Sequence, residues 1–154
     1  MPGPIETRLA ELGLTLPDAP APAANYVPYV RWGEMLVVSG QISMGPEGLI
    51  LGKLGADLDV EAGAVAARYC ALSLLAQVRA ACNGDLERLR QVVKLTGFVN
   101  STPDFTRQPE VINGCSDTLV EILGERGRHS RSAVSAAALP RGVAVEVEGI
   151  FLTA

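Results

Sequence analysis

The sequence predicts an α+β fold, a two-layer sandwich in which two helices pack on one face of a mixed sheet. Its 154 residues fit a single domain. Hydrophobic residues make up 48% of the chain and charged residues 19%, so the chain can bury a core and disorder is not expected. Strand-like and helix-like segments follow one another in the order β-β-(β)-α-β-α-β-β, which favours a sheet with helices on one side.

The first 24 residues form an extension to this pattern. Residues 4–13 are predicted to be a short helix, because Pro4 suits its first turn and Gly13 suits its C-terminal end. Three prolines between residues 17 and 22 favour an extended connector over residues 17–24. We therefore divide the chain into residues 1–24, a helix with its connector, and residues 25–154, the main domain.

Hydrophobic periodicity and turn residues place the elements of the main domain. Its helices are predicted at residues 59–82, where Asp57 or Asp59 can cap the N-terminus, and at about 109–124. The tight turn at residues 140–142 joins the last two strands. The predicted strands are residues 26–31, 35–39, 91–100, 132–139 and 143–152, with a short apolar piece at 49–51.

Charge and hydropathy exclude several classes of protein. The chain has 13 Lys and Arg against 17 Asp and Glu, a formal charge of −4, whereas nucleic-acid binding relies on clustered positive charge. No apolar run reaches the roughly 20 residues that a membrane-spanning helix needs. Glu6, Arg8 and Glu11 lie where a signal peptide would be apolar. We therefore expect a cytoplasmic protein that binds neither nucleic acid nor membranes.

The cysteines and the single histidine do not suggest a metal site. Cys70, Cys82 and Cys115 are odd in number and form no CxxC motif, which favours reduced thiols. His129 cannot build a zinc site with such scattered thiols, and no neighbouring Ser/Asp order suggests a catalytic triad around it. Cys70 and Cys82 are predicted to be core residues. Cys115 could be an accessible thiol, although without a neighbouring base it is a weak nucleophile.

Two glutamates lie on one face of the last predicted strand. Side chains alternate along a strand, so Glu146 and Glu148 share a face with Ala144 and Ile150. This face is either a solvated outer surface or a surface that another subunit covers.

The predicted strand 132–139 consists almost entirely of small residues and begins directly after Arg131. Small side chains allow another group to approach the strand closely. A guanidinium can bind a carboxylate through two parallel hydrogen bonds, which a lysine cannot do. Arg131 is therefore either a carboxylate anchor at the rim of a cleft or an ordinary surface arginine of the basic loop 126–131.

Three blocks of the sequence resemble the RidA/YjgF family. The tail RSAVSAAALPRGVAVEVE (residues 131–148) is similar to the family ending A-R-S-x-V-x-V-x-x-L-P-x-x-x-x-V-E-I-E-A. The segments YVPYVRWGEMLVVSGQI (26–42) and VVKLTGFVNSTPDF (92–105) resemble its Y-S-x-A-V-x-x-G-x-x-x-x-S-G-Q and V-x-K-x-x-V-F-V…D-F stretches. The blocks occur in the family's order and extend from Tyr26 to the tail, so residues 1–24 lie outside the resemblance.

The resemblance implies a chorismate-mutase-like fold, a homotrimer with clefts between subunits, and no metal or organic cofactor. It implies hydrolysis of reactive enamines and imines, such as 2-aminoacrylate, to 2-keto acids and ammonia. The residues that match the family's functional positions are Arg131 for the substrate carboxylate, Glu146 for the attacking water, Tyr26 and Gly40 in the cleft, and Asn113 on the second helix.

The sequence also departs from the family pattern. Ala133 occupies the position of the family's cysteine, where its backbone can still bind a ligand, and Val27 and Pro28 replace a serine and a glutamine. These changes leave two alternatives to a deaminase. One is a non-catalytic trimer that binds small carboxylates or keto acids as a sensor or carrier. The other, an endoribonuclease or translation inhibitor, is disfavoured by the acidic charge and the low aromatic content.

Overall fold

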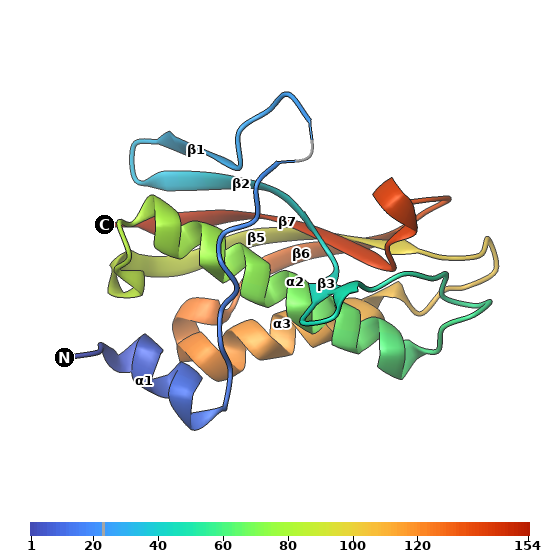
Figure 1. Ribbon diagram of the computed structural model, residues 1–154, viewed down its shortest axis with the longest axis horizontal. Helices are drawn as coiled ribbons and strands as arrows, with labels where there is room; N and C mark the ends of the chain where they lie inside the picture. The colour runs from blue at the N-terminus through green and yellow to red at the C-terminus, as the bar shows by residue number, and fades with distance from the viewer. Residues whose placement is uncertain (23) are drawn as a thin grey trace.

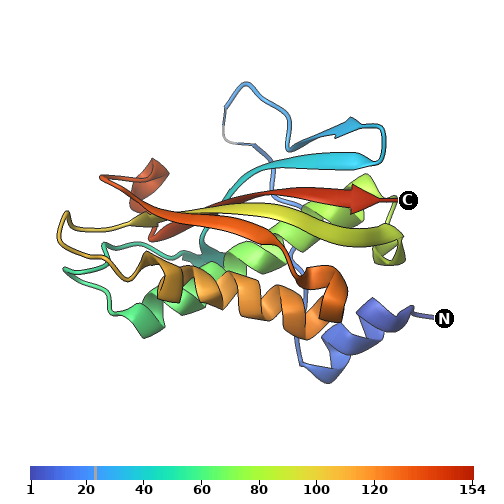
Figure 2. The same cartoon turned by 180° about the vertical axis from the view of Figure 1, so that it is seen from behind.

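A five-stranded mixed sheet carries helices on one face and leaves the other face uncovered (Figures 1 and 2). The computed structural model describes residues 1–22 and 24–154, so Ala23 of the predicted connector lies outside the described residues. The helices are α1 (Pro4–Glu11), α2 (Val60–Ala81) and α3 (Gln108–Leu123), with short 3₁₀ turns η1 (Leu86–Arg88), η2 (Gly124–Gly127) and η3 (Pro140–Gly142). The strands are β1 (Tyr29–Trp32), β2 (Met35–Ile42), β3 (Met44–Gly45), β4 (Gly48–Leu49), β5 (Leu89–Asn100), β6 (Ser130–Ala136) and β7 (Val145–Thr153).

The sheet order is β1-β2-β7-β5-β6, and β3 and β4 form a separate small hairpin. Only β5 and β6 are parallel, because α3 connects them across the face of the sheet. The remaining neighbours are antiparallel. This arrangement confirms the predicted α+β class and the mixed sheet with its helices on one face.

Close contacts between small residues bring α2 and α3 together over the sheet. A Cβ added at Gly114 of α3 would overlap the backbone of Ala64 on α2. A Cβ at Gly63 would lie 3.1 Å from Val111 Cγ1. On the sheet side, Ile112 fills the space that Gly97 of β5 leaves. The alanine-rich character of α2 is therefore explained by tight helix packing. Asp59 begins this helix as expected, and its carboxylate accepts from the Ala62 N–H at 2.8 Å.

Several strand ends differ from the expectation, among them the end of the second strand, which continues to Ile42, the start of the first strand and both ends of the sixth. The first strand begins at Tyr29 and not at Tyr26, because Pro28 has no N–H and cannot return the hydrogen bond that its carbonyl accepts from the Ser39 N–H at 2.9 Å. The sixth strand covers Ser130–Ala136 and not residues 132–139. There the Lys53 ammonium donates to the Ala137 carbonyl at 2.6 Å, so the next backbone group bonds outside the sheet.

The N-terminal helix packs into the same core as the main domain. Ile5 is 1% exposed and Leu9 3%, and both belong to the hydrophobic cluster formed under the sheet. The Glu87 carboxylate of η1 accepts from the Ile5 N–H at 2.6 Å, which satisfies one of the free donors at the helix start. The helix is thus held by both burial and capping.

No helix within residues 1–22 and 24–154 is long and apolar enough to cross a membrane.

We expect Ile5→Ala to destabilise the protein by about 2–4 kcal/mol, because it removes buried methyl groups and leaves a cavity between α1 and the core. Urea unfolding at one protein concentration measures the change. Thr7→Ala on the exposed side of the same helix is the control and should alter the free energy of unfolding by less than about 0.5 kcal/mol. Equal effects of the two substitutions would contradict the burial of α1.

Candidate functional site

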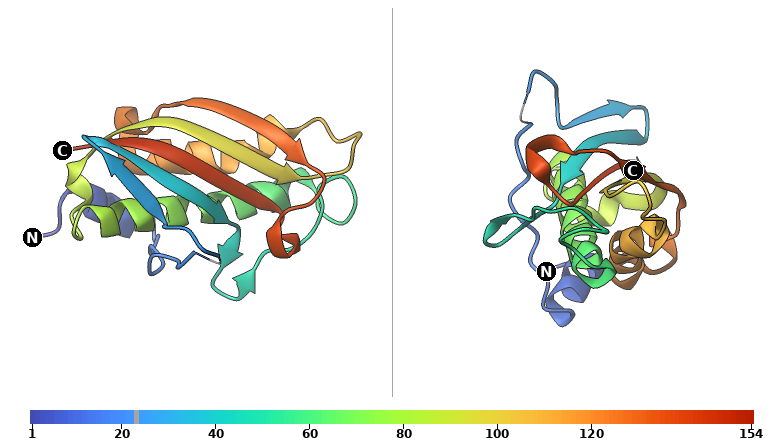
Figure 3. Two further views of the ribbon diagram at one scale, coloured as in Figure 1. Left: turned by 90° about the horizontal axis from the view of Figure 1, so that it is seen from above. Right: turned by 90° about the vertical axis from the view of Figure 1, so that its right-hand side faces the viewer.

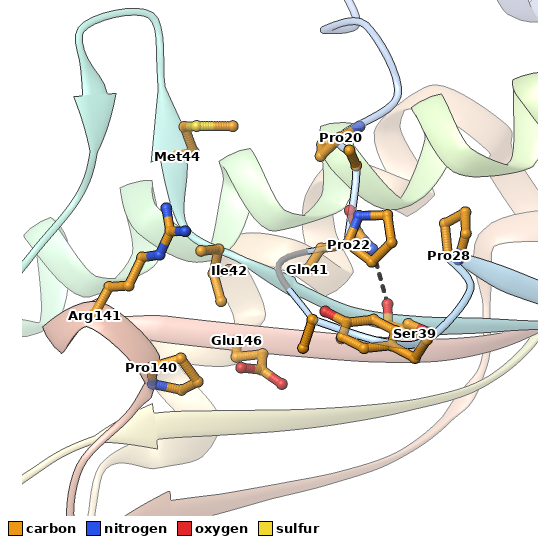
Figure 4. A pocket seen from close by; sticks show the side chains of 14 residues that line it. Pro20, Pro22, Pro28, Ser39, Gln41, Ile42, Met44, Pro140, Arg141 and Glu146 are labelled. Atoms are coloured by element: carbon orange, nitrogen blue, oxygen red, sulfur yellow. Dashed lines mark hydrogen bonds between the residues drawn. The ribbon is translucent and has the colours of Figure 1, made fainter.

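The uncovered face of the sheet has a cavity of about 450 Å³ around Glu146. Figure 4 shows Glu146 on β7 at its base, with Pro20 and Pro22 of the connector on one side and Arg141 on the other. Tyr26 and Gly40 line the same cavity. Three of the predicted site residues, Tyr26, Gly40 and Glu146, therefore lie together.

A bulge in β2 brings Gly40 against the Glu146 carboxylate. The pairing of β2 with β7 shifts between Val38 and Gln41, which adds one residue to β2 at this point. A Cβ at Gly40 would lie 2.9 Å from Glu146 Cδ and closer still to Oε2. Only glycine leaves room for the carboxylate in this position.

Glu146 is half-buried, and its surroundings favour the protonated form. Burial, with a contribution from the nearby Glu148 carboxylate, raises the pKa of Glu146 above its usual value. Among residues 1–22 and 24–154, no donor forms a hydrogen bond with its carboxylate. The group is therefore free to accept a proton from a water molecule or a ligand in the cavity.

Hydrogen bonds hold the segments that carry Tyr26 and the connector. The Ser39 hydroxyl donates to the Val27 carbonyl at 2.8 Å, which fixes the bend next to Tyr26. On α2, the buried Gln77 donates through Nε2 to the Pro20 carbonyl at 2.6 Å. The wall of the cavity is therefore attached to the helix beneath it.

Arg131 and Asn113 form a second group, on the opposite face of the sheet. Arg131 is aligned with Leu95 of β5, whose side chain is fully buried under the helices, and Glu146 is aligned with Phe98. Leu95 and Phe98 are three residues apart and so point to opposite faces. Within one chain, Arg131 and Glu146 do not share a cavity.

Helix α3 holds the guanidinium of Arg131 at one end. NH1 donates to Asn113 Oδ1 at 2.9 Å and to Ser116 Oγ at 3.1 Å, and NH2 donates to the Pro109 carbonyl at 3.3 Å. Nε donates to none of the described residues. Ala133, two residues along β6 from Arg131, lies on the same face and packs against the core.

The structure also shows polar groups that the sequence does not indicate. Ser116 Oγ lies 2.8 Å from Nε2 of His129, which is half-buried in the loop before β6. These residues are 13 apart and on different elements, so no local spacing links them. Arg141 is exposed at the rim of the Glu146 cavity, in a turn where its φ is 60°.

The cysteines are all buried. This confirms Cys70 and Cys82 as core residues and makes the accessible thiol expected at Cys115 wrong. Cys115 lies on the same face of α3 as Ile112 and Leu119, and burial raises its pKa to about 12, so it stays protonated. Within the described ranges, no group of three His, Cys, Asp or Glu side chains is arranged to hold a metal ion.

Comparison with known proteins identifies similar chains along almost the whole length. Residues 6–148 match the family described as "YjgF/chorismate mutase-like, putative endoribonuclease". Protein TCP17 of Trypanosoma cruzi is 50% identical over 150 residues, which cover 96% of this chain and 93% of that protein.

Solved structures give the same result. The crystal structure of Atu1372 from Agrobacterium tumefaciens is 48% identical, covers 98% of this chain and 93% of its own, and has a TM-score of 0.91. Among more distant structures, Escherichia coli TdcF with bound serine is 25% identical, with 88% and 94% of the two chains covered and a TM-score of 0.60.

We expect the raised pKa of Glu146 to make the protein less stable as the pH rises. The folded state holds the proton more tightly than the unfolded state, so stability falls from about pH 4.5 upward through the folded pKa and then levels off. Glu146→Gln should therefore be more stable than the unmodified chain at pH 8 and lose this advantage at pH 4.

Urea unfolding between pH 4 and pH 8 at one protein concentration measures this difference. Glu47→Gln, at an exposed turn, is the control and should show no pH-dependent gain. A gain for Glu146→Gln that grows toward low pH would show that the sign of the pKa shift is wrong.

Proposed function

The chain belongs to the YjgF/chorismate-mutase-like family, and on that basis we propose that it hydrolyses small enamines and imines of the 2-aminoacrylate type to 2-keto acids and ammonia. The observation that carries the proposal is the pattern of hydrogen bonds made by the Arg131 guanidinium. Its guanidinium is held by α3 through NH1 and NH2, while Nε donates to no described residue. The edge formed by Nε and NH2 matches a carboxylate, which all such substrates share. The bound serine in the TdcF structure, a small molecule with a carboxylate, supports the same ligand class.

Glu146 supplies the base in this proposal. The imine carbon is electrophilic, so a water oxygen attacks it and the carbon–oxygen bond forms as Glu146 takes a proton from the water. Glu146 then returns this proton to the nitrogen, which gives a carbinolamine with a hydroxyl and an amino group on the same carbon. Glu146 next takes the hydroxyl proton and passes it to the amino group. The carbon–nitrogen bond breaks, ammonia leaves, and the carbonyl of the keto acid forms. The raised pKa of Glu146 suits these transfers because it makes the carboxylate a stronger base. The Tyr26 hydroxyl would bind the nitrogen end.

The site would be completed between subunits. Arg131 and Glu146 lie on opposite faces of one sheet, so a ligand that contacts both requires two chains. The face of the sheet opposite the helices is seen from above in Figure 3, left. It is rich in exposed apolar side chains, among them Trp32 at 83%, Val30 at 55% and Val37 at 42% exposure. An apolar surface of this kind on a small chain favours association. We therefore infer that the chain forms a homotrimer, as the family resemblance implies. We also propose that the protein is cytoplasmic, as expected from its sequence.

Two other functions are weaker. A non-catalytic carboxylate binder is favoured by Ala133, which offers no thiol or hydroxyl beside Arg131. Keto-acid binding without turnover of any imine would support it. The endoribonuclease in the family description is disfavoured because Glu146 and Glu148 add negative charge to a chain that is already acidic, and a phosphate backbone would be repelled.

We expect Arg131→Ala and Glu146→Gln each to lower kcat/KM for imine hydrolysis by about 10- to 100-fold, the effect of losing a charged hydrogen bond. Keto-acid release from imines generated by an amino-acid oxidase measures this loss. Arg128→Ala removes a neighbouring exposed arginine and is the matched control. Full activity in Arg131→Ala would refute the proposed site.

Mixing the two inactive variants tests whether the site lies between subunits. In randomly mixed trimers about one interface in four combines an intact Arg131 with an intact Glu146 from a neighbour, so co-expression should restore about a quarter of the activity. A site within one chain would give no restoration.

We expect Val37→Asp to dissociate the assembly, because it places a charge in the apolar face that the partner would cover. Light scattering measures the molar mass. It should give about three times the 16.2 kDa of one chain for the unmodified protein and the mass of one chain for the variant. Val65→Asp changes an exposed valine on α2 and should leave the mass unchanged. An unmodified protein that is monomeric at all concentrations would refute the trimer.

A further inference from the structure

Behind Arg131 lies a chain of hydrogen bonds that the proposed reaction does not use. Arg131 NH1 contacts Ser116 Oγ at 3.1 Å, and Ser116 Oγ contacts His129 Nε2 at 2.8 Å. His129 Nδ1 in turn contacts the Gly127 carbonyl at 2.6 Å. Three elements, β6, α3 and η2 with the loop that follows it, contribute to this chain.

The groups at its two ends fix the direction of every hydrogen bond, because Arg131 NH1 can only donate and the Gly127 carbonyl can only accept. The Gly127 carbonyl can only accept, so Nδ1 of His129 carries the proton. Burial lowers the pKa of His129 and outweighs the hydrogen bond to the Gly127 carbonyl, which raises it, while the Arg131 charge lowers it further. The ring is therefore neutral and Nε2 is an acceptor. Ser116 therefore donates its hydroxyl proton to Nε2 and offers an oxygen lone pair to Arg131 NH1.

This direction matters for Arg131. A serine hydroxyl can rotate, and without a partner it would offer Arg131 either a lone pair or a proton. Because the Ser116 hydroxyl donates its proton to Nε2 of His129, the hydroxyl can no longer rotate, and an Oγ lone pair faces the guanidinium. Asn113 occupies the second hydrogen of NH1, so this nitrogen is held by two acceptors. Nε donates to none of the described residues, and NH2 keeps a second hydrogen besides the one that it donates to the Pro109 carbonyl of α3, so both nitrogens can still donate to a ligand carboxylate.

We propose that Ser116 and His129 are positioning residues that orient the Arg131 guanidinium for a ligand carboxylate. The proposal rests on the function above, in which Arg131 binds that carboxylate. Ser116 is not assigned as a nucleophile, because the lone pair that would attack is the one that Arg131 occupies.

The same arrangement gives the site a spectroscopic reporter. The chain contains a single histidine, so a long-range ¹H–¹⁵N spectrum of protein labelled at histidine nitrogen contains the signals of His129 alone. We expect a protonated Nδ1 and a bare Nε2 without ligand, the reverse of the tautomer that free neutral histidine prefers. Pyruvate, a 2-keto acid, should shift the Nε2 signal of the unmodified protein, because a carboxylate on Arg131 alters the Ser116 bond.

Two variants separate positioning from a general structural effect. We expect Ser116→Ala and His129→Phe to weaken pyruvate binding, measured by calorimetry, about tenfold, and Ser116→Ala to abolish the shift of Nε2. Ser130→Ala is the matched control, since the Ser130 hydroxyl donates to the Val93 carbonyl and not to Arg131. Circular dichroism establishes that each variant is folded.

The outcomes distinguish this proposal from the proposed function. An Nε2-protonated tautomer would overturn the hydrogen-bond chain whether or not a ligand binds. Pyruvate affinity in Ser116→Ala within twofold of that of the unmodified chain would overturn the positioning role and leave Arg131 as the anchor. If the unmodified protein binds no pyruvate and hydrolyses no imine, the proposed function fails and the positioning role fails with it, even with the expected tautomer.

Discussion

The pairing of β5 with both β6 and β7 determines which face of the sheet each polar side chain occupies. Leu95 of β5 aligns with Arg131 on β6, and Phe98 aligns with Glu146 on β7. Side chains alternate strictly along a strand, so a shift of one residue in either pairing would exchange the two faces. Arg131 would then leave its acceptors on α3, and Glu146 would be buried under the helices. The chemistry of the protein therefore depends on strand register.

Much of this arrangement could be predicted from the sequence. Alternation in residues 143–152 places Glu146 on one face, and Asp59 marks the start of the long helix. The periodicity of α3 also contained the information that Cys115 is buried, because it lies three residues after Ile112 and four before Leu119. Local patterns succeed here because each depends on one element.

Contacts between distant segments could not be predicted in this way. Ser116 and His129 meet only because η2 turns the chain back along α3 before β6 begins. The contact between Gly40 and Glu146 needs both the bulge in β2 and the pairing with β7. Tyr26 reaches the cavity from a bend outside the sheet, which the strand pattern alone assigns incorrectly. Tertiary packing decides these positions, and no spacing in the sequence encodes them.

The connector forms part of the cavity wall without belonging to the sheet. Pro20 and Pro22 face Glu146 from a segment that is attached to α2 through Gln77. Exchanging residues there would alter the size and shape of the space above Glu146 while the strand pairing stays as it is. Under the proposed function, substitutions in this short segment would change the side chain that the ligand can carry and leave Arg131 and Glu146 in place. Laboratory evolution toward bulkier ligands would then begin at Pro20 and Pro22.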